Sequence, residues 1–260
     1  MAKLSDHQSS SFTKLMYIGD SGTGKTGSLA SLVPDYDLRI LDLDNGLDIL
    51  KAYVKRDCPD RLSSIDFETV RDVFTASDTQ GATVKKAAAF TDSAKLMTKW
   101  SDGTVPSEWG EKTIFVLDSL TTLGRAALAW ATGMNPTAKD GRQWYMAGQQ
   151  ALEDIIAMVT SDDFHANVIV ISHVSYSETQ GNPKGYPATL GSALGPKISR
   201  YFNNLILAES AGTGTNVKRT IRVVPNDLID LKTAAPFAFA DRSLPLETGL
   251  ATLFATLRSN

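Results

Sequence analysis

The chain has 260 residues, with 26 Lys and Arg against 29 Asp and Glu and a formal net charge of −3. No stretch approaches the roughly 18 apolar residues that a membrane helix needs, and the first residues lack the apolar core of a signal peptide. We therefore expect no membrane insertion and a cytoplasmic protein. A single cysteine, Cys58, excludes an intramolecular disulfide. The slightly acidic total argues against a protein that coats duplex DNA over a large surface.

The predicted elements alternate between short apolar runs and longer segments with helical periodicity. Residues 1–12 are polar and predict a flexible N-terminal arm, whereas 13–260 is typical of a single domain. The apolar runs predict strands at 15–18, 38–43, 65–69, 113–117 and 168–171, and the periodicity predicts helices at 83–99 and 142–160. This alternation indicates an α/β fold with a mainly parallel central sheet flanked by helices.

The pattern changes after about residue 200. Segments 204–209 and 217–224 flank the turn sequence A-G-T-G-T-N, which predicts a C-terminal antiparallel hairpin. A further antiparallel strand is expected at 228–232 and a short helix near 247–257. Two segments, 132–141 and 174–196, fit no regular pattern. Long loops inside a compact domain are usually functional or disordered, so both are candidates for binding.

The sharpest motif follows the first predicted strand. Residues 19–26 read G-D-S-G-T-G-K-T, the full G-x-x-x-x-G-K-[ST] pattern of a phosphate-binding loop, or P-loop. The glycines let successive N–H groups point at phosphate oxygens, Lys25 would neutralise the phosphates, and the Thr26 hydroxyl would ligate Mg²⁺. A glycine-rich turn without a ligand is the weaker alternative, because a strand precedes the loop and a helix follows it. The expected nucleotide-binding residues are Gly19, Asp20, Ser21, Gly22, Thr23, Gly24, Lys25, Thr26 and Gly27.

Acidic residues follow two other predicted strands. Asp118 ends the run T-I-F-V-L-D and is the candidate for the second magnesium ligand, the alternative being a simple cap of the next helix. Many motor ATPases carry a catalytic Glu directly after this Asp, but here the residue is Ser119. The base must therefore come from elsewhere, and L-D-L-D-N-G-L-D offers Asp44. Asp42 and Asp44 alternate with leucines, so we expect both on one face of a strand.

Together these pieces resemble the ATPase core of the RecA family of recombinases, and particularly its short phage-encoded members described as single-strand annealing ATPases. The resemblance covers roughly residues 14–240 and implies a RecA-like P-loop NTPase core. It places the general base on Asp44, where the family usually has Glu, and a contact to adenine on Asp48. His173 after the run I-V-I-S would be the γ-phosphate sensor, although a lone His after an apolar strand is more often structural. Lys232 in K-T-A-A-P-F would reach the γ-phosphate of a neighbouring subunit.

The two irregular segments fall where this family has its DNA-binding loops. Single-strand binders combine cations that follow the phosphates with aromatics on which bases stack. The alternative is that such residues are ordinary surface cations and core aromatics. The candidates for DNA contact are Arg142, Trp144, Lys184, Tyr186, Lys197 and Arg200.

The resulting functional hypothesis is an ATP- and Mg²⁺-dependent ATPase that binds single-stranded DNA and aids annealing or recombination. The resemblance implies head-to-tail assembly into a ring or filament, a single-strand DNA-binding protein as a further partner, and a location in the host cytoplasm if a phage encodes the chain. The alternative is a P-loop ATPase or nucleotide switch that acts on a protein partner without contacting DNA.

Overall fold

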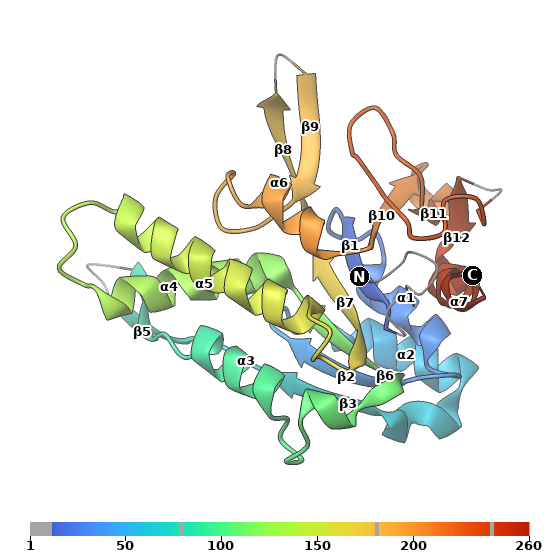
Figure 1. Cartoon of the computed structure of the whole chain (residues 1–260), viewed down its shortest axis with the longest axis horizontal. Helices are drawn as coiled ribbons and strands as arrows, with labels where there is room; N and C mark the ends of the chain where they lie inside the picture. Colours follow the sequence, from blue (N-terminus) through green and yellow to red (C-terminus); the bar gives the residue numbers. More distant parts are fainter. Residues whose placement is uncertain (1–11, 78–80, 180–181, 240–241, 260) are drawn as a thin grey trace, which may run out of the picture.

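The computed structural model describes residues 12–77, 81–179, 182–239 and 242–259. Within these residues, eight strands form one sheet in the order β12-β11-β10-β1-β7-β6-β2-β3 (Figure 1). Six neighbouring strands are parallel: β1 (Lys14–Gly19), β2 (Asp37–Asp42), β3 (Ile65–Thr69), β6 (Gly110–Asp118), β7 (Ala166–Ser172) and β10 (Asn204–Ala211). The strands β11 (Lys218–Arg222) and β12 (Ser243–Pro245) extend the sheet in antiparallel fashion. The expected α/β fold, with its C-terminal antiparallel extension, is confirmed.

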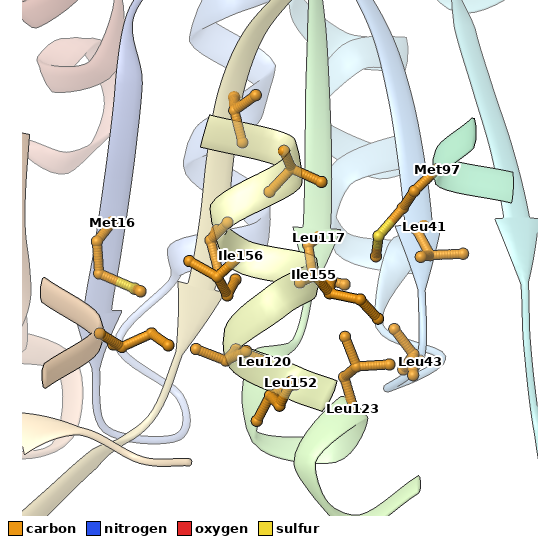
Figure 2. Close-up of a cluster of buried hydrophobic side chains, with 14 of the residues drawn as sticks. Met16, Leu41, Leu43, Met97, Leu117, Leu120, Leu123, Leu152, Ile155 and Ile156 are labelled. Atoms are coloured by element: carbon orange, nitrogen blue, oxygen red, sulfur yellow. The ribbon is translucent and has the colours of Figure 1, made fainter. Parts of the chain in front are cut away.

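Helices cover both faces of the sheet because alternate strand residues are apolar on each side. One core lies beneath α3 (Ala89–Thr98), α4 (Leu120–Met134) and α5 (Arg142–Thr160). Figure 2 shows part of it, with Ile155 and Ile156 of α5 packed near Leu117 of β6. The other core lies beneath α2 (Leu47–Asp57), α7 (Leu246–Arg258) and the P-loop helix α1 (Lys25–Ser28), which continues as a 3₁₀ turn over Leu29–Leu32. No helix in the described residues is long and apolar enough to cross a membrane.

The expected helix over 83–99 is wrong in its first part. Residues 83–86 belong to β5 (Gly81–Lys86), which pairs with β4 (Val73–Ser77) in a separate hairpin. Thr83 and Val84 are β-branched, which favours a strand. The helix begins at Ala89 because the Asp72 carboxylate, far back in the chain, accepts the N–H groups of Ala88 and Ala89 at 3.0 and 2.9 Å.

The segment 174–196, for which the sequence predicts no regular structure, contains two strands. Val174–Thr179 (β8) and Asn182–Pro187 (β9) form an antiparallel hairpin that projects from the end of β7, at the top of Figure 1. It is followed by α6 (Gly195–Ile198) and a 3₁₀ turn over Ser199–Tyr201. The expected strand at 228–232 is reduced to one bridge between Lys232 and Leu205, and β12 takes its place in the sheet.

Of the expected N-terminal arm, residues 1–11 lie outside the described residues. Its last residue, Phe12, stacks on the His165 ring with centroids 5.7 Å apart. The N–H of the next residue, Thr13, donates to Asn167 Oδ1 at 2.9 Å. From Phe12 onward the chain is therefore held beside the start of β7, in the middle of the sheet.

Candidate functional site

The P-loop connects the carboxyl end of the buried strand β1 to α1. Gly22 and Gly24 have φ values of 79° and 92°, a backbone conformation that glycine adopts without strain. A Cβ atom on Gly24 would also lie 2.5 Å from Leu246 Cδ2, so the chain has no room for a side chain there. Lys25 is buried, and its Nζ donates to the main-chain oxygens of Gly19 and Asp20 at 2.7 and 2.9 Å. The loop thus holds a cation at its centre.

Asp118 lies beside the loop at the carboxyl end of β6, where its side chain is 3% exposed. The Thr26 hydroxyl donates to Asp118 Oδ2 at 2.7 Å. The pKa of Asp118 is raised to about 6, mainly because the carboxyl is buried. The neighbouring Asp44 and Asp42 contribute to this rise, whereas the Thr26 hydrogen bond and Lys25 lower the pKa. Asp118 does not cap α4, since the N-cap residue is Ser119, whose hydroxyl accepts the N–H of Thr122. Thr26 and Asp118 therefore meet as expected.

Asp44 and Asp42 do not share a strand face as the sequence predicts. β2 ends at Asp42, which is buried and turns the chain, because its Oδ1 accepts the N–H groups of Asp44 and Asn45 at 3.1 and 2.7 Å. Asn45 takes the left-handed conformation that this turn requires, with φ of 58°. Asp44 is exposed and accepts a hydrogen bond from the hydroxyl of Thr122 on α4. The turn brings Asp44 to the P-loop pocket.

His173 follows β7 directly and lines the same pocket. Its N–H donates to the Thr121 hydroxyl at 3.1 Å, and its carbonyl oxygen accepts the N–H of Ala188 at 2.8 Å. The main chain of His173 is therefore fixed from both sides at the base of the β8–β9 hairpin. His173 therefore lies beside the P-loop, the place at which the resemblance to the RecA family implies a γ-phosphate sensor.

The pocket has a volume of about 350 Å³ and two chemically different parts. The polar part contains Lys25, Thr26, Asp44, Asp118 and His173, together with Arg219 from β11. The apolar part contains Ile49 and Tyr53 of α2 and Leu246 of α7.

Tyr53 packs directly on the P-loop helix, since a Cβ on Gly27 would lie 2.7 Å from its ring. Asp48, expected to contact adenine, instead lines a separate hollow with Lys51 and Phe67. Ile49 and Tyr53 are four residues apart, and this helical spacing in the sequence places both side chains on one face of α2.

Residues 11–234 match the family described as AAA domain (AAA_24). The chain belongs to the AAA domain family. With its P-loop, this AAA domain is a P-loop ATPase. No curated protein matches the chain.

Solved structures resemble this AAA domain at low identity. One is the KaiC-like protein PH0186 from Pyrococcus horikoshii OT3, with 10% identity, a TM-score of 0.43, and coverage of 90% of this chain and 84% of that one. Another is the flagellar accessory protein FlaH from Methanocaldococcus jannaschii, with 12% identity, a TM-score of 0.43, and coverage of 91% and 87%. A third is an ATPase from the type III secretion system of pathogenic bacteria, with 13% identity, a TM-score of 0.40, and coverage of 76% and 51%.

The oxygen donors of the AAA domain fit a magnesium ion. A hydroxyl and a carboxylate, from Thr26 and Asp118, lie 2.7 Å apart beside Lys25. Mg²⁺ prefers hard oxygen ligands and usually takes one or two from the protein, with waters and substrate phosphates completing the octahedron. Within the described residues no group of three or more His, Cys, Asp or Glu side chains is arranged to hold a metal. Thr26 and Asp118 would therefore supply two of the ligands of such an ion, and the others would come from water or a phosphate group.

Lys232 does not line the P-loop pocket of its own chain. Its N–H donates to the carbonyl of Leu205 at 3.2 Å, and its carbonyl accepts the N–H of Leu205 at 2.8 Å. The side chain is exposed next to β10, and the ring of nearby Phe237 is fully exposed. Both side chains are therefore open to solvent in the single chain.

Most candidate DNA-binding cations of the AAA domain are already paired with acids. Arg142 binds Asp140 at 2.7 Å, Lys184 binds Asp230 at 3.0 Å, and Arg200 binds Glu153 at 2.6 Å. Trp144 Nε1 donates to the carbonyl of Asn135, Tyr186 lies half-buried on β9, and Lys197 is exposed on α6. The two irregular segments border one hollow, which is lined by Thr132, Gly133 and Pro136 of the first and by Leu190 and Gly191 of the second. Gln149 Nε2 on α5 also donates to the carbonyl of Leu190 at 2.8 Å.

Unpaired cations gather at a place that the sequence did not indicate. A hollow of about 810 Å³ lies between β5, α4, the start of α5 and residues 190–191. Within the described residues its lining includes Lys85, Arg125 and Tyr145 but no Asp or Glu. A neighbouring hollow shares Arg125 and adds Arg71 and Phe74. We call these two hollows the α4 groove. In the described part of the chain, Arg71, Lys85 and Arg125 form no ion pair. Asp72 also lines the second hollow, where its carboxylate accepts the N–H groups of Ala88 and Ala89 at the start of α3.

Proposed function

We propose that this AAA-domain ATPase binds single-stranded DNA in the α4 groove and uses ATP to promote annealing or recombination. The observation that carries the proposal is the position of α4. Thr122 in its first turn holds Asp44 in the nucleotide pocket, and Arg125, one turn later, lines the groove. A strand that binds Arg125 therefore acts on the same rigid helix that orients Asp44.

The groove has the chemistry that a single strand needs. Cations neutralise phosphates without regard to sequence, and exposed aromatic rings stack on bases. Arg71, Lys85 and Arg125 supply three cations, and Tyr145 and Phe74 are 46% and 56% exposed. Arg142, Lys184 and Arg200 are paired with carboxylates, so they can contact DNA only when a phosphate replaces the carboxylate partner. Ion pairs on the surface are weak because water and salt screen them, so phosphates can replace these carboxylates readily.

For hydrolysis, the proposed roles follow the pocket. Lys25 neutralises negative charge on the ATP phosphates. Thr26 and Asp118 would hold Mg²⁺, which would neutralise further negative charge on the phosphate oxygens. Asp44 orients the attacking water and accepts its proton, and Thr122 keeps the Asp44 carboxylate turned into the pocket. His173 at the base of the β8–β9 hairpin is placed to sense the γ-phosphate.

Asp44→Asn is expected to keep ATP affinity and lose turnover by about 10²–10⁴-fold, the usual contribution of a positioned base. Thr122→Val should lower kcat by a smaller factor, because it removes only the hydroxyl that holds Asp44. Thr160→Val, which removes a hydroxyl at the end of α5 that lines neither the P-loop pocket nor the α4 groove, is the matched control and should keep the wild-type rate. Equal losses of binding and turnover in Asp44→Asn would give Asp44 a structural role.

DNA binding is tested by the anisotropy of a labelled oligothymidine as a function of salt. Arg125→Ala and Lys85→Ala should each weaken binding by about tenfold at low salt and reduce the slope of log K against log salt by about 0.7 per lost phosphate contact. Lys55→Ala, which removes an exposed lysine from α2 on the opposite face, should change neither quantity. Wild-type binding by both groove variants would exclude the groove. Absence of binding by the wild-type protein, with no stimulation of ATP hydrolysis, would instead favour the switch that acts on a protein partner.

Assembly is the second part of the proposal. If Lys232 completes the γ-phosphate site of a neighbour, the contact is head-to-tail and makes rings or filaments. ATP with single-stranded DNA should then drive oligomerisation, and Lys232→Ala should lose DNA-stimulated hydrolysis while the monomer still binds ATP. Mixing Lys232→Ala with Asp44→Asn subunits should restore part of the activity, since some interfaces pair an intact Asp44 with an intact Lys232. No recovery in the mixture, and a monomer by light scattering with ATP and DNA, would contradict the shared site.

A further inference from the structure

Arg219 of β11 reaches the P-loop from the far end of the chain. Its Nε donates to the carbonyl oxygen of Gly22, 197 residues earlier, at 3.2 Å. Its Cδ would lie 3.4 Å from a Cβ on Gly24. The side chain lines the same pocket as Lys25, although no P-loop motif includes it. The nucleotide pocket therefore contains a second cation from a distant element.

The C-terminal extension holds this cation in place. β11 pairs with β10, with Arg219 opposite Ser210, and then with β12. The chain continues from β12 into α7, where Leu246 packs on Gly24. Two side chains of the extension thus cover the glycine that precedes Lys25. The added antiparallel strands thus bring both side chains to the P-loop.

The guanidinium of Arg219 has N–H groups that are available to bind a ligand. Among the described residues it forms no ion pair, and the Nε–H bond to Gly22 is its hydrogen bond. Four further N–H groups on the terminal nitrogens remain. By contrast, Arg222 on the same strand forms an ion pair with Glu209, with 2.8 Å between Nε and Oε2. A planar guanidinium with free terminal donors matches the geometry of a phosphate, which it can bind through two parallel hydrogen bonds.

We propose that Arg219 is a phosphate-binding residue of its own subunit, which binds the polyphosphate of the nucleotide together with Lys25. This inference rests on the ATPase activity and is independent of DNA binding and of the Lys232 contact between subunits. The Nε–H bond to Gly22 fixes the side chain along the loop, and the terminal N–H groups donate to phosphate oxygens. Nucleotide binding thereby connects the C-terminal extension to the P-loop.

Titration calorimetry on the full chain with ATP, ADP and adenosine tests this role. Arg219→Gln keeps an N–H donor for Gly22 but removes the charge, and it should raise the Kd for ATP and ADP by about 10- to 100-fold, as expected for a lost charge-assisted hydrogen bond. Arg219→Lys should recover part of that loss. Lys218→Gln removes the exposed neighbouring charge from the same strand and is the matched control, with an unchanged Kd. Binding of adenosine, which has no phosphates, should be the same in all four proteins.

Two outcomes would overturn the inference. One is an ATP Kd for Arg219→Gln equal to that of the wild type. The other is an equal loss of ATP and adenosine binding, which would mean that Arg219 only shapes the loop. Melting temperatures without nucleotide report whether Arg219→Gln is folded. If it is not folded, the ATP and ADP Kd values of Arg219→Lys test the inference instead. In that case a wild-type Kd for both ATP and ADP in Arg219→Lys, at high salt as well as low, would contradict bidentate guanidinium binding.

Discussion

Replacing Lys25 by alanine is expected to lower ATP hydrolysis by about a thousand-fold or more and to abolish ATP-dependent assembly. Lys25 is the buried cation at the centre of the P-loop, within the pocket that also contains Asp118 and Asp44. Removing a preorganised charge donor from such a site costs about 10²–10³-fold in turnover, and here substrate binding is lost as well. Steady-state hydrolysis and calorimetry of ATP binding measure the two effects separately.

The fold should survive this substitution. Within the described residues, the hydrogen bonds of Lys25 Nζ go to main-chain oxygens of its own loop, those of Gly19 and Asp20. Circular dichroism should therefore match that of the wild type, and Lys55→Ala on α2 should hydrolyse ATP normally. Hydrolysis by Lys25→Ala at the wild-type rate would show that the phosphates bind elsewhere.

Asp118→Asn is expected to abolish hydrolysis and, without nucleotide, to make the protein more stable at neutral pH. Burial raises the pKa of Asp118 from 3.8 to about 6. The folded state therefore binds this proton more tightly than the unfolded state does. The stabilisation is complete below pH 3.8 and is lost as the pH rises through 6, where the buried carboxyl must ionise. The shift of about two pKa units corresponds to up to about 3 kcal/mol.

Asparagine keeps the oxygen that accepts the Thr26 hydroxyl but never ionises. At pH 8 the variant should unfold at a temperature higher by about 2–10 °C, since each kcal/mol moves the midpoint of a chain this long by about 2–4 °C. The difference between variant and wild type should disappear below about pH 4. Calorimetric scans from pH 4 to 8 measure this dependence. A variant that is less stable than the wild type at pH 8 would show that the ionised carboxylate holds the apo fold together.

The local sequence determined the elements that depend on near neighbours. The motif over 19–26 specified the turn from β1 to α1, because its glycines are required by backbone conformation alone. The short apolar runs predicted all five of the expected parallel strands, and the helical periodicity of 142–160 predicted α5. Both kinds of element depend on the spacing of apolar residues, because this spacing decides which side chains are buried. Asp118 was identified by its place at a strand end, where open α/β sheets bind ligands.

Contacts between distant residues decided the rest. The start of α3 depends on Asp72, which accepts N–H groups sixteen and seventeen positions away. Asp44 reaches the pocket through a turn held by Asp42, and Thr122 orients it from 78 residues further along. Arg219 and Leu246 cover the P-loop only because β11 and β12 extend the sheet past β10. A local pattern records which residue types a segment needs, but hydrogen bonds and packing across such separations exist only once the sheet has formed.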